Sequence, residues 1–532
     1  MSKLLARIQR GFLRLRLHGH LFRLNRKIAD HSHPSSDAHP VVFFNASARL
    51  RGLNLNAAFS MLTAWGVQLA GVPVLHFACR SGMKHCVLGA GLGNPTAPPP
   101  CQGCIADTRR FTGSAPTVWF EYQADSELQA KLETLSVEEM KSVVYSGRPL
   151  GELTLPSLRW ILRRHHLADD APTRYLYQAF ILSAHNVAQE FDALLSLNEP
   201  NAVVVFNGLQ YPEATARWVA QQRGIRVITH EVGFQPFSAF FSDGHATAYP
   251  IHLPDEFELT DAQNERLDAY LSQRFQGEFT MAGIRFWPEM RGLEEAFLEH
   301  AEQFKQIVPV FTNVIFDTSQ LHANTVFSDM FAWLETVTDI VAAHAETLFV
   351  IRAHPDEMRK GKESRESVED WVRAQGVEDL PNVVFVGPNE PLSSYELIRQ
   401  AKFVIVYNSS IGLEATLLGV PVLCGGQARY TQYPTVFFPT SPAEYAHRAE
   451  EFLAADEIDI PAEFLSNARR FLYYQLYKVS LPFERYLTEH PSPGYVQLKR
   501  FSWKSLSLKN AVSVKTIVRG ILDKDEFTIS NH

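Results

Sequence analysis

The stretch AVVVFNGLQYPEATARWVAQQRGIRVIT, residues 202–229, decides the fold class of this chain. It contains a short apolar run at 202–207, a helical pattern from Pro212 to Arg223, and a second apolar run at 225–229. A strand, a helix and a strand joined by short loops form a right-handed crossover unit, in which the two strands are parallel. The sequence therefore predicts a parallel sheet covered by helices.

The same alternation of short β-branched runs and longer helical stretches continues on both sides of this unit. Further strands are expected at 41–45, 72–77, 307–313, 347–352, 382–386, 403–407 and 421–424, and helices at 54–69, 125–200, 324–344, 394–401 and 411–418. A chain of 532 residues is too long for one hydrophobic core. We predict an α/β fold with two Rossmann-like, doubly wound parallel-sheet domains facing a cleft, at 41–290 and 306–480, with the break between about 283 and 306.

The charge is distributed unevenly along the chain. The net charge is -8, which argues against a nucleic-acid partner, yet residues 1–30 contain eight Lys or Arg and a single acid, Asp30. The tail at 490–532 is also basic, with five Lys or Arg and no acid between 495 and 515. Two interpretations stay open for both ends: a helix lying on an anionic inner-membrane surface, or a solvated helix face and a disordered tail.

No apolar run approaches the roughly 20 residues that span a bilayer, and arginines interrupt every apolar stretch of the N-terminus, which excludes a signal peptide. We therefore expect a cytoplasmic protein, either free or peripheral to the inner membrane.

Ligands of open α/β sheets bind beyond the carboxyl ends of the strands. In the second half, Arg352, His354 and Pro355 directly follow the strand 347–352. The proline favours an extended backbone at His354, and a guanidinium beside an imidazole suits a phosphate or a carboxylate. The alternative is an ordinary loop histidine.

A second candidate follows the strand 403–407, where the chain passes through a tight polar turn directly into a helix. Ser409 and Ser410 are placed to cap that helix, whose free N–H groups favour an anion. Gly412 would let a ligand approach the backbone, and Glu414, one turn into the helix, would reach a ribose. We interpret this turn as part of a nucleotide site.

In the first half, Glu231 follows the strand 225–229 and is the candidate general base, with His230 as a second candidate. The alternative for Glu231 is a capping or loop carboxylate. Asn207, Asn45 and Ser47 follow neighbouring strands and are candidates for binding the acceptor. Arg49 and Arg51 are the nearby cations that an anionic substrate would need.

The motifs RAHPDE at 352–357, NSSIGLEA at 408–415 and GVPV at 419–422 resemble those of capsule polysaccharide biosynthesis glycosyltransferases, including Kdo transferases and, more distantly, bacterial sialyltransferases. The resemblance implies a GT-B fold and a nucleotide-sugar donor, with a CMP-sugar such as CMP-Kdo favoured. His354 and Pro355 would contact the nucleotide, and Ser409 and Ser410 its phosphate. The acceptor would be a growing polysaccharide or a glycolipid.

The catalytic motif of that group is two acids and a glycine, and Glu231-Val232-Gly233 resembles it except that valine replaces the second acid, which is usually the base. The resemblance implies a direct displacement in which a base deprotonates the acceptor hydroxyl, with no cofactor or metal needed for catalysis. Two other functions stay open: transfer of a polyol phosphate from a CDP donor, and a non-catalytic role in polysaccharide assembly, with Val232 marking a lost site.

Four of the five cysteines gather in one Gly/Pro-rich stretch: Cys79, Cys86, Cys101 and Cys104. The last two form a CxxC pair of the kind found in zinc knuckles, whereas the first two are separated by six residues, which is wider than usual. Structural zinc, free or redox-active thiols and an iron–sulfur cluster are the alternatives. We expect Cys424, inside a predicted buried strand, to serve packing alone.

Overall fold

The computed structural model describes residues 3–35, 37–46, 52–89, 94, 96–276, 291–359, 361 and 363–529. The chain divides into two compact units. Unit 1 comprises Met1–Leu162, Leu167–Pro250 and Leu476–His532, and unit 2 comprises Arg163–His166 and Ile251–Gln475. Each unit is described by itself.

Unit 1 is built on a seven-stranded sheet with the order β12-β6-β5-β4-β1-β2-β3. The strands are β1 Val41–Asn45, β2 Val74–Cys79, β3 Thr117–Phe120, β4 Ala202–Phe206, β5 Arg226–Val232, β6 Ser238–Ser242 and β12 Leu481–Pro482. The five strands from β3 to β5 are parallel, and β6 and β12 extend the sheet in antiparallel pairing. The predicted crossover of residues 202–229 is therefore confirmed as β4, α8 and β5.

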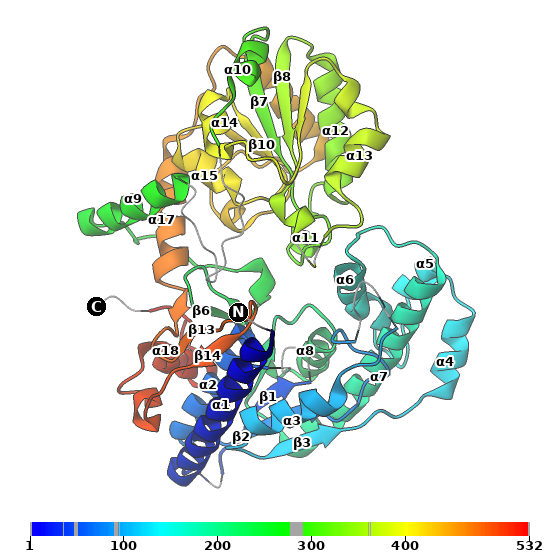
Figure 1. Cartoon of the computed structure of the whole chain (residues 1–532), viewed down its shortest axis with the longest axis vertical. Helices are drawn as coiled ribbons and strands as arrows, with labels where there is room; N and C mark the ends of the chain where they lie inside the picture. The colour runs from blue at the N-terminus through cyan, green and yellow to red at the C-terminus, as the bar shows by residue number, and fades with distance from the viewer. Residues whose placement is uncertain are drawn as a thin grey trace. The chain divides into compact units, whose positions relative to one another are not determined.

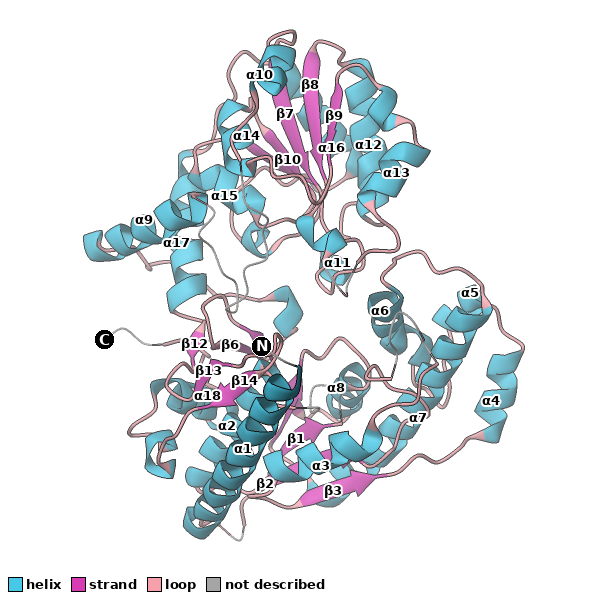
Figure 2. Cartoon of the chain, in the orientation of Figure 1, coloured by secondary structure: helices cyan, strands magenta, loops and turns pink. Residues whose placement is uncertain are grey.

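Helices cover both faces of this sheet (Figure 2). The helices of unit 1 are α1 Lys3–His31, α2 Leu55–Leu69, α3 Cys101–Phe111, α4 Ser126–Glu133, α5 Val137–Lys141, α6 Leu150–Leu162, α7 Ala171–Asn198, α8 Glu213–Gln222 and α18 Val512–Leu522. One face packs against α2, where Phe59, Leu62 and Trp65 are fully buried. The opposite face packs against α7 and α8 through Phe191 and Val219.

The two basic ends of the chain fold into unit 1 and lie close to one another, as Figure 1 shows for blue α1 and the orange and red C-terminal elements. Leu21, Leu24 and Ile28 of α1 and Val514 and Ile517 of α18 are buried in the same core cluster. The expectation of a disordered tail is therefore wrong, because α18 carries an apolar face that packs on α2. Before α18, the strands β13 Leu487–Glu489 and β14 Val496–Leu498 form an antiparallel hairpin.

Within the described residues, no helix combines the length and the apolar character that crossing a membrane requires.

Unit 2 contains a five-stranded, all-parallel sheet with the order β11-β10-β7-β8-β9. Its strands are β7 Gln306–Phe311, β8 Thr347–Arg352, β9 Val383–Val386, β10 Val404–Val406 and β11 Val422–Cys424. Its helices are α9 Asp261–Phe275, α10 Glu295–Ala301, α11 Gln320–Ala323, α12 Met330–Ala343, α13 Val368–Ala374, α14 Ser394–Gln400, α15 Ile411–Leu417, α16 Pro442–Ala454 and most of α17 Ala462–Tyr477. A mainly parallel sheet in unit 1 and an all-parallel sheet in unit 2, each packed against helices, confirm the predicted α/β fold class.

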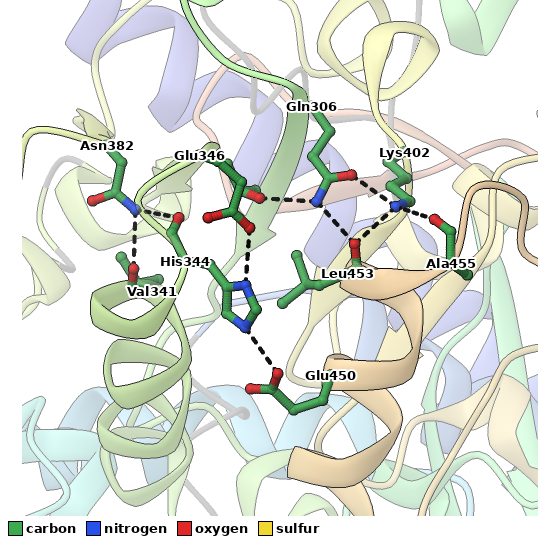
Figure 3. A network of polar contacts seen from close by, with 10 residues as sticks. Gln306, Val341, His344, Glu346, Asn382, Lys402, Glu450, Leu453 and Ala455 are labelled. Atoms are coloured by element: carbon green, nitrogen blue, oxygen red, sulfur yellow. Dashed lines mark hydrogen bonds and ion pairs between the residues drawn. The ribbon is translucent and has the colours of Figure 1, made fainter.

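A polar network closes the amino-terminal edge of this second sheet (Figure 3). Lys402 donates to Gln306 Oε1 at 2.7 Å and to the carbonyl oxygen of Leu453 at 3.1 Å. His344 lies between Glu346 and Glu450, at 3.1 and 2.8 Å. These contacts give the polar groups at the strand starts hydrogen-bond partners within the protein. Polar groups without such partners, which could bind a ligand, are therefore expected at the carboxyl edge of the sheet.

The domain boundaries differ from the predicted ones. The predicted first domain extended to residue 290, but unit 1 gives way to unit 2 after Pro250, and the segment beyond it contacts unit 2 through Gln432 and Tyr433. The predicted second domain ended at 480, and the chain returns to unit 1 at Leu476, where β12 joins the first sheet. These boundaries depend on contacts between distant segments, which local patterns do not contain.

Candidate functional site

The second sheet has a topological switch point between β7 and β10, since the chain adds β8 and β9 on one side of β7 and β10 and β11 on the other. Asn313 follows β7 and Asn408 follows β10, and Asn313 Nδ2 donates to Asn408 Oδ1 at 2.6 Å. Gln320 Nε2 donates to the same oxygen at 3.3 Å, and its own Oε1 is buried without a hydrogen-bond partner. This polar bridge lies where open α/β sheets bind ligands.

Arg352 ends β8 at the same carboxyl edge, and only 3% of the residue is exposed. One guanidinium nitrogen, Nη2, donates to the carbonyl oxygen of Glu390 at 3.4 Å, whereas Nη1 is buried and has no hydrogen-bond partner. Burial lowers the pKa of Arg352 to about 10. A buried cationic donor without a partner is costly, and an anion placed against Nη1 would remove that cost.

His354 is half-buried and begins the short helix η3 Pro355–Met358. Its Nδ1 accepts a hydrogen bond from the backbone N–H of Asp356 at 3.1 Å, which places the proton of the neutral ring on Nε2. Burial lowers the pKa of His354, against the opposing effect of Asp356 and Asp317. The imidazole is therefore neutral near pH 7 and acts through hydrogen bonding.

The turn after β10 differs from its predicted geometry. Ser410 occupies the N-cap of α15 but makes no side-chain capping bond, and Ser409 is buried with its carbonyl oxygen accepting from the Tyr430 hydroxyl at 2.8 Å. A Cβ atom on Gly412 would lie 2.3 Å from that hydroxyl. The glycine is thus required by the packing of Tyr430, and its predicted role of admitting a ligand is not needed to explain it.

Glu414 is also a correction. It is 4% exposed, and its two carboxylate oxygens are bound by the Arg274 guanidinium and the Tyr395 hydroxyl. Burial lowers the pKa of Arg274, but the nearby Glu414 carboxylate raises it more, so the pKa is raised overall. The predicted ribose contact is wrong because both carboxylate oxygens of Glu414 already have hydrogen-bond partners. Arg274 lies 140 positions before Glu414, so the sequence pattern could not indicate this pair.

In unit 1 the half-buried Glu231 is the next-to-last residue of β5 and lies at the carboxyl edge of the sheet. Its Oε2 accepts from Asn207 Nδ2 at 2.9 Å, and its Oε1 accepts from the backbone N–H of Val232 at 3.0 Å and from Asn56 Nδ2 at 3.4 Å. These neutral donors hold the carboxylate in place. The strand was predicted to end at Thr229, but pairing with β6 extends it to Val232.

Asn207 directly follows β4 and adopts a left-handed conformation, with φ of 62°. Its Oδ1 accepts from the backbone N–H groups of Leu209 and Gln210 at 3.1 and 3.3 Å, which forms a tight turn, while its Nδ2 is directed to Glu231. The structure therefore brings two predicted residues, Asn207 and Glu231, into contact at the sheet edge.

The other first-half candidates do not join this pair. His230 is 1% exposed, lies between the rings of Phe206 and Phe241, and has a pKa lowered to about 3 by burial, so the prediction of a base here is wrong. Asn45 is buried and directed to His76 at 2.8 Å. Ser47, Arg49 and Arg51 lie outside the described residues.

Three residues of these sites were not singled out from the sequence: Asn313, Gln320 and Asn56. Asn313 was readable as the polar last residue of the predicted strand 307–313, as Asn207 is of the apolar run 202–207. Asn56, by contrast, lies within the first turn of α2, and only the folding of that helix against β5 brings it to Glu231.

The four clustered cysteines, predicted as metal ligands, line one small cavity, and none of them forms a disulfide. Cys424 is fully buried in β11 and donates to the carbonyl oxygens of Tyr407 and Gly426, both at 3.1 Å, as expected of a packing residue.

Residues 285–434 match the family described as capsule polysaccharide biosynthesis protein. The match includes all the predicted nucleotide-site residues, from Arg352 to Glu414, and confirms the resemblance for this segment. Protein FixF of Sinorhizobium fredii is 26% identical over 233 residues, which are 43% of this chain and 49% of that protein. The chain thus spans about half the length of this relative.

Among solved structures, the chain is similar to two Thermosulfurimonas dismutans KpsC domains. The β-Kdo 2,4 transferase is 13% identical, covers 56% of this chain and 84% of its own, and gives a TM-score of 0.35. The β-Kdo 2,7 transferase is 15% identical, covers 64% and 90%, and gives a TM-score of 0.33. The Neisseria meningitidis UDP-GlcNAc 2-epimerase is 12% identical, covers 82% and 99%, and gives 0.25. The fold assignment rests on the strand order described above.

Proposed function

We propose that this protein is a glycosyltransferase of surface polysaccharide assembly, which takes a sugar from a nucleotide-activated donor held at the carboxyl edge of the unit 2 sheet. The observation that carries the proposal is the buried, unpartnered Nη1 of Arg352 in the segment that matches the capsule family. A donor phosphate is the ligand that would complete its hydrogen bonding.

Neighbouring groups favour a nucleotide over a simple anion. The neutral His354 supplies an Nε2–H donor, and the bridge between Asn313 and Asn408 offers amide groups suited to a sugar or a base. Leaving-group charge on the phosphate would be stabilised by Arg352 and by His354. We favour a CMP-sugar such as CMP-Kdo as the donor, on the resemblance of the motifs.

For the acceptor we propose Glu231 as the general base. A carboxylate held by Asn207, Asn56 and a backbone N–H keeps its orientation while still having lone pairs for a hydroxyl proton. The deprotonated acceptor oxygen would attack the anomeric carbon as the nucleotide phosphate leaves. In this scheme no side chain forms a covalent intermediate, and a metal ion has no assigned task.

The test is a thermal-shift screen of CMP, CDP, UDP and GDP on the full chain, followed by turnover of the best-matched nucleotide-sugar. A ligand at about 100 times its dissociation constant adds roughly 2.7 kcal/mol to the free energy of unfolding. Mass analysis of the products then identifies the bond that breaks. A sugar transferred without phosphate supports the proposal, a polyol phosphate transferred from a CDP donor replaces it, and no stabilisation by any nucleotide overturns it.

We further propose that unit 1 contacts an anionic membrane surface through the place where its basic ends meet. Arg23 and Lys27 of α1 and Arg500 of the tail line a cavity of about 320 Å³, and none of the three has a carboxylate ion pair within the described part of the chain. On the same helix the apolar side chains Leu15 and Phe22 are 70% and 69% exposed. Cations beside exposed apolar side chains are typical of interfacial helices.

Vesicle sedimentation tests this surface. We expect the chain to pellet with vesicles containing phosphatidylglycerol and to remain in solution with pure phosphatidylcholine. At about 1 kcal/mol for each cation, the triple variant Arg23→Ala, Lys27→Ala, Arg500→Ala should bind roughly a hundredfold more weakly. The matched control is a triple alanine variant of exposed cations away from the cavity: Lys131, Arg174 and Arg373. Equal loss in the control, or binding that is indifferent to lipid charge, overturns the membrane proposal.

A further inference from the structure

The stretch between β2 and α3 places four thiols around one small space. Cys79 ends β2, Cys86 lies in the following loop, and Cys101 and Cys104 lie in the first turn of α3. All four line a cavity of about 20 Å³, together with Ala46 and apolar side chains, and none is oxidised to a disulfide. A space of this volume holds a single small occupant such as a water molecule or an ion.

The backbone beside Cys79 donates a hydrogen bond to its sulfur, as backbone N–H groups do around metal thiolates. The N–H of Gly82 donates to Cys79 Sγ at 3.1 Å. Hydrogen bonds of this kind stabilise negative charge on sulfur and orient the ligand, which a neutral packing thiol does not need.

The second pair lies at a position that also favours thiolates. Cys101 and Cys104 occupy the first turn of the eleven-residue helix α3, whose amino end carries partial positive charge. Burial, by contrast, raises the pKa of Cys79 to about 12 and that of Cys86 to about 11, and the neighbouring sulfurs raise both further. Without a cation Cys79 and Cys86 are therefore protonated, and a bound metal would reverse this balance.

We infer that Cys79, Cys86, Cys101 and Cys104 bind one structural Zn²⁺ ion. Four thiolate ligands in a closed site suit zinc, with Zn–S distances of about 2.3 Å. Each thiol that coordinates the ion gives up its proton to solvent, so metal binding releases protons. No three of these four described sulfurs lie within 4.8 Å of one another, so coordination requires side-chain rotation toward the cavity.

The ion would fasten the loop that follows β2 to the carboxyl edge of the unit 1 sheet. Ala46, which lines the cavity, directly follows Asn45 at the end of the neighbouring strand β1. Of residues 80–100, the described ones (80–89, 94 and 96–100) contribute few large apolar side chains to the core, so a metal would supply the order that a core supplies elsewhere. The zinc would therefore support the acceptor side of the sheet without taking part in the reaction.

The experiment measures metal bound to the untagged full chain by plasma mass spectrometry. We expect about one zinc per chain, and at least a tenfold lower content in each of the four single Cys→Ser variants. Cys424→Ser is the matched control, because it removes a buried thiol that hydrogen-bonds carbonyl oxygens far from the cavity in sequence. Zinc retained in the four variants, or absent from the wild-type chain, overturns the inference.

A second measurement does not depend on the folding of variants. The wild-type chain reconstituted with Co²⁺ should show thiolate-to-cobalt charge-transfer absorption, which only sulfur ligands produce. The described residues contain another group that a metal could occupy, His165, His166 and Asp329, and cobalt bound there would lack this absorption. Iron with a visible chromophore in the purified protein would overturn the choice of zinc. Both measurements are independent of transferase activity.

Discussion

Replacing Arg352 by methionine tests whether Arg352 binds a ligand or stabilises the fold. Burial lowers the pKa of Arg352 from 12.5 to about 10, and at about 1.4 kcal/mol per pH unit this is roughly 3 kcal/mol against the charged form. Removal of the charge relieves that cost but gives up the hydrogen bond to the Glu390 carbonyl, worth about 1 kcal/mol or more. We therefore expect the free energy of unfolding without ligand to stay constant or to rise by up to about 2 kcal/mol.

The ligand response should change in the opposite direction. A charged hydrogen bond to phosphate is worth about 1.5–3 kcal/mol, so the variant should bind the nucleotide roughly 10–100-fold more weakly. At a concentration that stabilises the wild-type chain by about 2.7 kcal/mol, the variant should gain only about 0.4–1.4 kcal/mol. Urea unfolding with and without nucleotide measures both quantities, with the exposed Arg373→Met as control. Loss of more than about 2 kcal/mol without ligand, with the nucleotide response intact, would refute the reasoning.

Three further predictions follow from the same contacts. Glu231→Gln should lower the turnover rate by about 10²–10⁴-fold with unchanged donor binding, and a rate within a few-fold of wild type would exclude Glu231 as the base. The Asp329 and Glu366 carboxylates raise the pKa of His166 to about 10. The ion pairs of protonated His166 therefore stabilise the fold fully below the unfolded pKa near 6.5, and this stabilisation is lost as the pH rises through about 10. The difference in unfolding free energy between wild type and His166→Asn should shrink over that range. Glu414→Gln leaves Arg274 buried without its counter-ion and should cost about 3–5 kcal/mol in urea unfolding, whereas a contribution of Glu414 to ribose binding alone would leave stability unchanged.

Local patterns predicted the elements whose two faces are both covered. β1 and β8 coincide with the predicted strands 41–45 and 347–352, because every residue in them is buried and the apolar run therefore matches the strand. The edge strand β3, Thr117–Phe120, gave no such signal, since only its last residue is buried. The short β12 depends entirely on its partner β6, some 240 positions earlier, and could not be read from its own two residues.

The predicted site residues divide along the same line. Arg352, Asn207 and Glu231 lie at strand ends, and the topology of a parallel sheet places these ends at the edge where such sheets bind ligands. Glu414 and Gly412 were assigned by their spacing along one helix, yet their surroundings are set by Arg274 and Tyr430 from other elements. The sequence pattern thus indicated the carboxyl edge of each sheet as the place of the site. Tertiary packing determined which side chains at that edge keep polar groups without a hydrogen-bond partner.

The valine after Glu231 is explained by the strand itself. Successive side chains of a strand point to opposite faces, and Val232 packs, half-buried, on the apolar cluster that contains Ala239 and Leu481. A carboxylate there would have to be buried against that cluster, whereas the Glu231 carboxylate lies at the carboxyl edge of the sheet, where Asn207 and Asn56 donate to its oxygens. A valine at position 232 therefore does not remove the carboxylate that the sheet edge presents, and Glu231 is the residue that we propose as the base.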